Sequence, residues 1–345
     1  MQLEGKRVLI TGGTGSLGQA LTRRLLSGEM GKPAKVTIFS RDEAKQHSMR
    51  LSYLHRTTAT DEIIYNSSRE LLTFLIGDIR DYASVQHAIR DADVIFNAAA
   101  LKQVPTCEYF PFEAVQTNVV GAQNLVRAIP ENGNCVELVV GISTDKACKP
   151  VNVMGMTKAL QERIFINANQ GQDHTRFVCV RYGNVIASRG SVIPLFRDQI
   201  QNGGPVTITT KEMTRFLLTL DQAVDTIFAA VRGAERGETY IPRAPAARVV
   251  DFAAVMINGL NIRIEFTGIR PGEKTHEILV SEEEVSRTTE RDGYYIIHPI
   301  APELQREPIC RPAVSAEYSS REVTLNSSAL SELLQTTELA YAAAR

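Results

Sequence analysis

The stretch Thr11-Gly12-Gly13-Thr14-Gly15-Ser16-Leu17-Gly18 decides how the rest of this 345-residue chain can fold. It follows a short apolar run and leads into a helix-like stretch, Leu17 to Leu26. Gly12 permits a tight turn, Gly15 lets a phosphate approach the backbone, and Gly18 lets helix and strand pack closely. The helix N-terminus then faces an anion, so a dinucleotide-binding loop is predicted. The residues expected to contact the cofactor here are Thr11, Gly12, Thr14, Gly15, Ser16, Leu17 and Gly18.

Strand-like apolar runs alternate with helix-like stretches through the first half of the chain. The runs are Lys6–Thr11, Lys35–Ser40, Leu71–Ile76, Asp93–Ala98, Val136–Ile142 and Phe177–Val180. This alternation indicates an α/β fold with a doubly wound parallel sheet, because crossover helices join parallel strands. Glycines and prolines punctuate shorter elements after Asn184. We therefore expect a Rossmann domain over 1–185, a smaller substrate lobe over 186–310 and a tail over 311–345, with a helix over 219–233 returning to the sheet.

Composition narrows the possible functions. Apolar residues make up 43% of the chain and charged residues 22%, and the net charge is -1. These values are those of an ordinary soluble protein and give no case for binding nucleic acid or an anionic membrane. The five cysteines lack metal or redox spacing, and no apolar run has the length of a signal peptide or membrane span. We expect a cytoplasmic protein with reduced thiols and no metal.

The end of the second strand predicts the type of dinucleotide. Enzymes that use NAD commonly place an acidic residue there to bind the ribose hydroxyls. Here Phe39 is followed by Ser40 and Arg41, and Lys45 comes shortly after. Cations and a hydroxyl suit a 2′-phosphate, which favours NADP; nearby Asp42 leaves NAD as the alternative.

Two further strand ends are expected to line the cofactor. Asp78 and Ile79 follow the third strand and are placed to meet the adenine. Ala98, Ala99 and Ala100 end the fourth strand with small side chains, as a backbone close to a cofactor needs. A plain packing role for the alanines is the alternative.

Acid–base residues follow the fifth strand. Ser143-Thr144-Asp145-Lys146 comes directly after it, and Met154 and Lys158 follow at a spacing that puts them on one helix face. An Asp-Lys dipeptide is more commonly a surface ion pair. Its position at the carboxyl end of a sheet strand, where such folds bind ligands, favours a functional pair instead.

Taken together, these stretches resemble the extended short-chain dehydrogenase/reductase family, and more closely the UDP-N-acetylglucosamine 4,6-dehydratases of bacterial polysaccharide biosynthesis. The resemblance runs to about Pro299. Besides the stretches above it includes Arg181-Tyr182-Gly183-Asn184-Val185, Gly190-Ser191-Val192-Ile193-Pro194, Thr214-Arg215-Phe216 and Arg270-Pro271-Gly272-Glu273-Lys274.

One position departs from most relatives. Met154 stands where they have a catalytic Tyr four residues before the Lys, and a thioether cannot take a proton. In this respect the chain is similar to the branch that makes capsule and O-antigen precursors of N-acetyl-L-fucosamine, in which dehydration goes with inversion at C5. The C5-retaining dehydratases remain the near alternative.

The resemblance implies a redox-neutral dehydration. Hydride leaves C4 of the sugar for NADP, the resulting ketone acidifies the C5 proton, water leaves from C6, and the hydride returns to C6. Asp145 is expected to be the acid at the C6 hydroxyl and Lys146 the base at C5, which requires Lys146 to be partly neutral. Thr144 is placed near the 4-hydroxyl. Lys158 is expected to bind the nicotinamide ribose and, without the Tyr, to be a candidate base at O4.

The same resemblance implies a site for the UDP-sugar on the smaller lobe. Arginines suit a diphosphate because their planar fork binds two oxygens at once. Glu273 and Glu277 are expected to order Arg270 or to touch the uridine ribose. A homo-oligomer, possibly a hexamer, is also implied. The substrate-binding candidates are Lys102, Asn184, Ser191, Val192, Pro194, Arg215, Arg270 and Glu273.

Two other functions stay open. A nucleotide-sugar 4-epimerase of the same fold needs the redox step at C4 but not the acid–base pair. A catalytically silent cofactor-binding protein is the second alternative, and Met154 is the feature in its favour.

Overall fold

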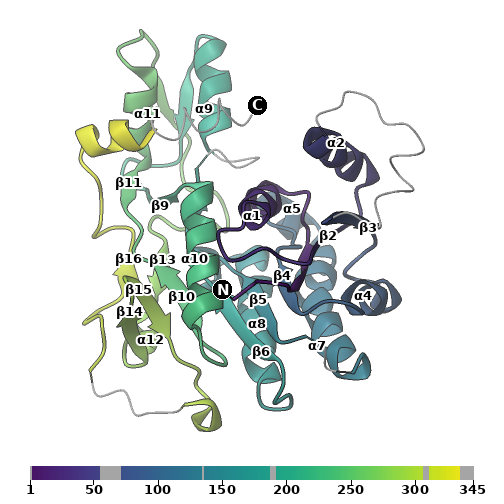
Figure 1. The fold of residues 1–345 in the computed structure, drawn as a ribbon. Coiled ribbons are helices and arrows are strands. Elements are labelled where there is room, and N and C mark those ends of the chain that lie inside the picture. Colours follow the sequence, from purple (N-terminus) through teal and green to yellow (C-terminus); the bar gives the residue numbers. More distant parts are fainter. Residues whose placement is uncertain (1, 55–70, 134–135, 187–191, 306–310, 335–345) are drawn as a thin grey trace.

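A nine-stranded sheet organises the molecule (Figure 1). The structure is a computed structural model that describes residues 2–54, 71–133, 136–186, 192–305 and 311–334. The strand order is β14-β15-β10-β6-β5-β4-β1-β2-β3. Strands β10 to β3 pair in parallel, while β15 and β14 continue antiparallel at one edge. The order reverses between β1 and β4, as in a doubly wound sheet, so the predicted α/β fold is confirmed.

The predicted elements have the following bounds. The sheet strands are β1 (Arg7–Thr11), β2 (Lys35–Ser40), β3 (Leu72–Ile76), β4 (Val94–Asn97), β5 (Leu138–Ile142), β6 (Arg176–Val180), β10 (Thr239–Pro242), β14 (Thr288–Arg291) and β15 (Tyr294–Ile297). The helices of this part are α1 (Ser16–Leu26), α2 (Glu43–Leu54), α4 (Tyr82–Ile89), α5 (Val104–Tyr109), α6 (Pro111–Ala114), η2 (Val115–Val120), α7 (Gly121–Glu131), η3 (Asp145–Ala147), α8 (Val153–Ala168) and α10 (Leu220–Gly233).

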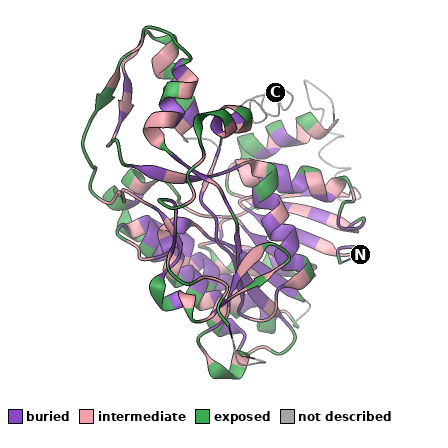
Figure 2. Cartoon of the chain, turned by 90° about the vertical axis from the view of Figure 1, so that its left-hand side faces the viewer, coloured by how far each residue is buried: buried purple, intermediate pink, exposed green. Residues whose placement is uncertain are grey.

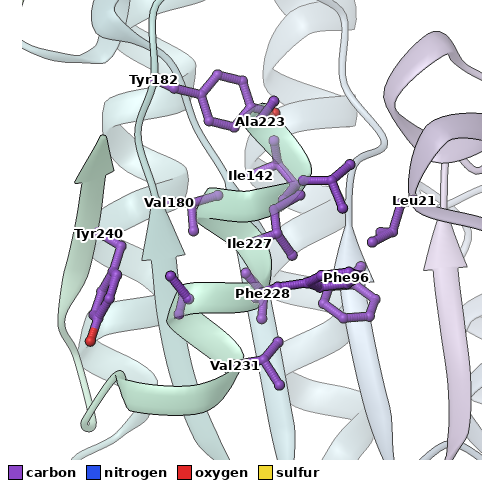
Figure 3. Packing of buried hydrophobic residues seen from close by; sticks show 14 of the residues in the cluster. Leu21, Phe96, Ile142, Val180, Tyr182, Ala223, Ile227, Phe228, Val231 and Tyr240 are labelled. Carbon is purple, nitrogen blue, oxygen red and sulfur yellow. The ribbon is translucent and has the colours of Figure 1, made fainter. Parts of the chain in front are cut away.

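Different helices cover the two faces of the sheet, and buried residues concentrate between the layers (Figure 2). On one face α10 packs beside α1, with Ile227 and Phe228 against Phe96 and Val180 (Figure 3). On the other face lie α4, α7 and α8. Burial of a side chain such as Ile227 or Phe228 stabilises the fold by about 1.5–3 kcal/mol. The helix predicted to return to the sheet is therefore confirmed, and a capping box of Thr219 and Gln222 begins it.

A smaller lobe has its own apolar cluster, to which Leu330 and Leu334 of the helical residues 327–334 contribute. The division expected at residue 185 stays a prediction, but the sheet crosses it, since β10, β14 and β15 all come later in the chain. The remaining elements are β7 (Asn184–Val185), α9 (Val192–Gln201), β8 (Val206–Ile208), β9 (Thr214–Leu218), β11 (Ala246–Arg248), α11 (Val249–Ile257), β12 (Ile264–Phe266), β13 (Ile278–Val280), α12 (Glu282–Val285), η4 (Pro302–Leu304) and β16 (Tyr318–Ser319).

The connection from β5 to α8 is unusually close-packed. Asn152 caps α8, and its side-chain oxygen accepts from the Gly155 N–H at 2.8 Å. A Cβ added at Gly155 would lie 2.2 Å from the carbonyl oxygen of Lys146. Only glycine therefore lets the first turn of α8 lie directly against the turn η3 that holds Asp145 and Lys146.

We expect Gly155→Ala to displace η3 from α8, because the new methyl group meets backbone and not a movable side chain. Overpacking of this kind costs about 1–3 kcal/mol of unfolding free energy, measured by urea denaturation. Gly171→Ala is the matched control, because nothing lies within 4 Å of the added Cβ and no left-handed backbone is involved. Equal stability of the two variants would contradict the packing assigned to Gly155.

Candidate functional site

The glycine loop lies where the strand order reverses, next to the end of β4. Gly12 has a φ of 66°, and a Cβ there would lie 2.8 Å from the Ala99 backbone. A Cβ at Gly18 would lie 2.4 Å from the carbonyl oxygen of Gly13. The tight turn and the close helix packing expected from the sequence are therefore both present, and the half-buried Ala98, Ala99 and Ala100 lie beside the loop as expected.

The N-terminus of α1 fits an anionic group. Gly15 precedes the helix without any side-chain cap, and the first turn holds no acidic residue. The positive end of the helix therefore has no carboxylate from its own first turn beside it, which suits a dinucleotide pyrophosphate.

The Thr11 hydroxyl joins two strands, so any contact of Thr11 with the cofactor stays a prediction for its backbone. Its side chain is fully buried, donates to Asn97 Oδ1 at 2.7 Å and accepts from the Ala99 N–H at 3.2 Å. The hydroxyl therefore links β1 to β4 and is not available to a ligand. A Thr at the last position of a buried strand gives no sequence signal that distinguishes these two roles.

The residues at the end of β2 agree with a nucleotide-ribose site. The Arg41 side chain is half exposed, and its guanidinium lies 3.7 Å from Asp78 Oδ2. Ser40 Oγ accepts from the Gln46 amide at 3.0 Å, and Lys45 forms an ion pair with Asp42. The acidic residue that could serve NAD is thus engaged by a lysine. Ile79, expected near the adenine, is buried against Gly121.

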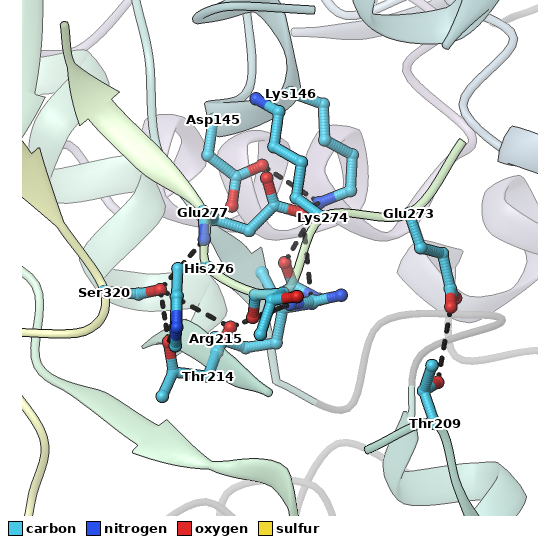
Figure 4. Close-up of polar contacts among 12 residues, drawn as sticks. Asp145, Lys146, Thr209, Thr214, Arg215, Glu273, Lys274, His276, Glu277 and Ser320 are labelled. Carbon is cyan, nitrogen blue, oxygen red and sulfur yellow. Dashed lines mark hydrogen bonds and ion pairs between the residues drawn. The ribbon is translucent and has the colours of Figure 1, made fainter. Parts of the chain in front are cut away.

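Lys146 lies between two buried carboxylates (Figure 4). Its Nζ is 3.0 Å from Asp145 Oδ1 and 3.0 Å from Glu277 Oε1. Asn184 Oδ1 accepts from the same ammonium at 3.3 Å, and the Thr144 hydroxyl donates to Asp145 Oδ1 at 2.9 Å. The structure thus brings together the predicted Asp145, Lys146, Thr144 and Asn184, and adds Glu277.

The charges of this group determine its proton affinities. Burial raises the pKa of Asp145, and the neighbouring Glu277 charge adds to this, although Lys146 opposes it. Burial alone would lower the pKa of Lys146, but Asp145 and Glu277 together raise it. The expectation of a partly neutral Lys146 is therefore wrong for the protein without substrate, because two carboxylates outweigh desolvation.

Lys158 and Met154 are both buried residues of helix α8. The Lys158 ammonium donates to the Ile142 carbonyl at 2.5 Å and to Gln161 Oε1 at 2.7 Å. Burial lowers its pKa to about 8. Met154 is buried in a small apolar cluster with Cys107 and Ala114, so its side chain fills space in that cluster.

The substrate candidates are spread over several elements. Arg215 lies 3.9 Å from Glu277 and donates to the Thr214 and Thr275 carbonyls. The Arg270 backbone N–H and the Thr209 hydroxyl both contact Glu273 Oε2, at 3.4 and 3.3 Å. Glu277, expected to order Arg270, points instead to Lys146.

The other four substrate candidates come from the end of β4 and from the start of α9 and the residue before it. Lys102 is exposed after β4, and Val192 and Pro194 lie in the first turns of α9. Ser191 lies outside the described residues.

Two residues that were not predicted from the sequence as site residues connect the region of the turn η3, which holds Asp145 and Lys146, to the segment 270–274 by hydrogen bonds. The Asn152 side chain donates to the Gly272 carbonyl at 2.7 Å, and Lys274 Nζ donates to the Cys148 carbonyl at 2.5 Å. The capping pattern could have identified Asn152 as a helix start. Its contact with Gly272, 120 residues further along the chain, has no local signal.

The described ranges of the chain contain no group of three or more His, Cys, Asp or Glu side chains that could hold a metal ion. None of their helices combines the length and apolar character that crossing a membrane requires.

Comparisons with known proteins agree with this geometry. A family model described as "Polysaccharide biosynthesis protein" matches residues 8–299. A Rickettsia akari protein named UDP-glucose 4-epimerase is 43% identical over 297 residues, 85% of this chain and 82% of that protein. A Campylobacter jejuni protein named UDP-N-acetylglucosamine 4,6-dehydratase (inverting) is 42% identical over 298 residues, 86% of this chain and 83% of that protein.

A solved structure extends the similarity to nearly the whole chain. Pen from Bacillus thuringiensis is 36% identical and has a TM-score of 0.85, covering 98% of this chain and 99% of that one. The resemblance inferred from the sequence motifs is thereby confirmed. The chain belongs to the polysaccharide biosynthesis protein family, whose extended short-chain dehydrogenase/reductase fold and dehydratase-like motifs it shares.

Proposed function

We propose that this protein is a UDP-N-acetylglucosamine 4,6-dehydratase that inverts C5 and uses bound NADP. The observation that supports this best is the pair of a buried Asp145 and a half-buried Lys146 at the carboxyl end of β5, on the same edge of the sheet as the glycine loop. Elimination of water needs an acid and a base held side by side, and this pair supplies both groups. The Campylobacter jejuni relative's name adds support for substrate and stereochemistry.

Each residue of the pair has a separate task. Asp145 gives a proton to the departing C6 hydroxyl, and its raised pKa favours the protonated carboxyl that this needs. Lys146 takes the C5 proton, so it must first lose the proton that Asp145 and Glu277 now hold on it. Thr144 donates to Asp145 and thereby orients its carboxyl group.

The oxidation at C4 needs a base other than a phenol. The nicotinamide supplies the chemistry of this step by accepting hydride from C4 and later returning it to C6. We propose that Lys158 takes the O4 proton, directly or through a water, because its low pKa makes a neutral amine accessible near neutral pH. In the structure its ammonium contacts Ile142 and Gln161, so this role requires the side chain to turn toward the sugar.

The proposal extends to cofactor, assembly and place of action. Arg41 at the end of β2 supports NADP over NAD. Exposed apolar side chains on the adjacent helices α5, α6 and α8, among them Tyr109, Phe112 and Leu160, support a homo-oligomer. We place the reaction in the cytoplasm, on precursors of capsule or O-antigen.

A nucleotide-sugar 4-epimerase is the second candidate, favoured by the name of the Rickettsia akari relative. It would use the C4 redox step and leave the C6 oxygen in place. The acid–base pair has no task in that reaction, which is why we rank it second.

The deciding assay is incubation with UDP-N-acetylglucosamine. We expect loss of one water by mass spectrometry and, by proton NMR in deuterated water, a product with deuterium at C5 in the inverted configuration. Asp145→Asn should lower turnover by about 10² to 10⁴, the usual contribution of a general acid. A product that retains the C6 oxygen would favour the epimerase, and retained configuration would favour the C5-retaining alternative.

The role of Lys158 predicts a specific pH dependence. The rate of C4 oxidation, followed as cofactor reduction in a rapid mixing experiment, should rise as pH increases through about 8 and then level off, because only the neutral amine accepts the O4 proton. Lys158→Ala should lower this rate by about 10² to 10⁴. Lys6→Ala is the control, since Lys6 pairs with Glu137 at the opposite edge of the sheet. Full turnover by Lys158→Ala with intact cofactor binding would rule the role out.

Cofactor choice is tested at Arg41. We expect Arg41→Ala to weaken NADP binding roughly tenfold, about 1.4 kcal/mol, in a fluorescence titration, while NAD binding stays unchanged. The loss follows from removing a charge-assisted contact to the 2′-phosphate. Arg243→Ala controls for removal of an exposed arginine, since Arg243 pairs with Glu290 near the edge of the sheet. If Arg41→Ala weakens the binding of NADP and of NAD equally, Arg41 does not discriminate between the two cofactors.

A further inference from the structure

Glu277 reaches the acid–base pair from a distant part of the chain. It precedes β13 and is 2% exposed, yet its Oε1 lies as close to Lys146 Nζ as the carboxylate of Asp145 does. The nearest other cation is Arg215, at 3.9 Å. Its side chain is therefore committed to the proposed catalytic pair.

Hydrogen bonds to Ser320, in the C-terminal region of the chain, fix the backbone of Glu277. Its N–H donates to Ser320 Oγ at 2.9 Å, and the Ser320 N–H donates back to the Glu277 carbonyl at 2.9 Å. Ser320 also contacts the Thr214 hydroxyl at 2.7 Å, and Thr214 contacts His276 Nδ1 at 2.8 Å (Figure 4). A network that joins β9, β13 and β16 thus fixes where this carboxylate can lie.

In both Asp145 and Glu277, one oxygen of the carboxyl group makes no hydrogen bond to the described residues. Asp145 Oδ2 and Glu277 Oε2 are buried and have no hydrogen-bond partner among the residues that the structure describes. Buried polar atoms in native proteins are normally satisfied, so two oxygens without a protein partner beside one ammonium mark a place for a water molecule, a bound group or a retained proton. Two neighbouring carboxyl groups that are both buried do not readily lose both protons, because their negative charges repel each other.

The surrounding charges indicate which carboxyl group keeps the proton. Glu277 faces Lys146, Arg215 and Lys274, which hold its pKa below the usual value although burial alone would raise it. Asp145 faces Lys146 and the negative Glu277, and its pKa is raised by burial and by that negative charge. The proton therefore belongs on Asp145, where the elimination needs it.

We propose that Glu277 is a positioning residue for the elimination step: its carboxylate holds the Lys146 ammonium in place and leaves Asp145 as the group that bears the proton. This rests on the proposed dehydratase function. In the elimination the electron pair of the C5–H bond forms the C5–C6 double bond, and the C5 proton goes to Lys146, which has first released its own proton to solvent from its partly exposed side chain. The C6–O bond breaks as Asp145 gives its proton to the departing oxygen. The O4 proton, which Lys158 takes during the oxidation, balances the proton that Asp145 gives up.

The test is the pH profile of water loss in Glu277→Gln and Glu277→Asp. Removing the negative charge lowers the pKa of both Asp145 and Lys146, so both limbs of the profile should move to lower pH, and turnover should fall about 10²-fold. Cofactor reduction by the substrate should persist, since C4 oxidation does not use this pair. Glu277→Asp should move the profile back toward that of the wild type.

Glu284→Gln is the matched control, because Glu284, in α12, is also a buried carboxylate but forms its ion pair with Arg181. It should lower the melting temperature and leave the pH profile unmoved. A Glu277→Gln profile that coincides with the wild-type profile would overturn the proposal while leaving the dehydratase function intact.

A second measurement does not depend on the folding or activity of a Glu277 variant. The infrared difference spectrum of wild type minus Asp145→Asn should show a protonated-carboxyl band at neutral pH. Its absence would overturn the proposal even if the enzyme dehydrates its substrate. Lack of any water loss by the wild-type enzyme would instead remove the dehydratase function.

Discussion

The contact of the Lys146 ammonium group with two buried carboxyl groups, those of Asp145 and Glu277, is the interaction on which the rest of the site depends. Removing one partner of a buried ion pair costs about 3–5 kcal/mol, because the other charge is left without compensation. The protein therefore has to assemble all three groups together. It does so by bringing the end of β5 against the segment that leads into β13.

The surrounding contacts explain how this assembly is held. Gly155 lets α8 start against the acid–base turn, and Asn152 caps that helix while it also holds the Gly272 carbonyl. Lys274 adds a second link to the carbonyl of Cys148. The turn that contains the acid and base is thus fixed both by its own helix and by the segment 270–274, so the geometry of the pair depends on both halves of the chain.

The sequence predicted much of the fold because its signals are local. Alternating apolar runs gave the parallel strands, and the glycines gave the first turn, whose tight packing against Ala99 the structure shows. The pattern also predicted that α10 returns to the sheet. Less local features were missed: Thr11 turned out to join two strands, and β10, β14 and β15 extend the sheet beyond the expected boundary.

By itself, the sequence determined the class of the fold, a doubly wound parallel sheet with a glycine loop after its first strand, and the presence of an acid and a base after its fifth strand, since both follow from short motifs and their spacing. Only the tertiary structure decided the charge state of that pair. Proton affinity depends on which groups surround an atom in space, and Glu277, more than a hundred positions away in the chain, is one of them. No periodicity or motif spacing encodes that neighbour, because folding alone brings it within reach of Lys146.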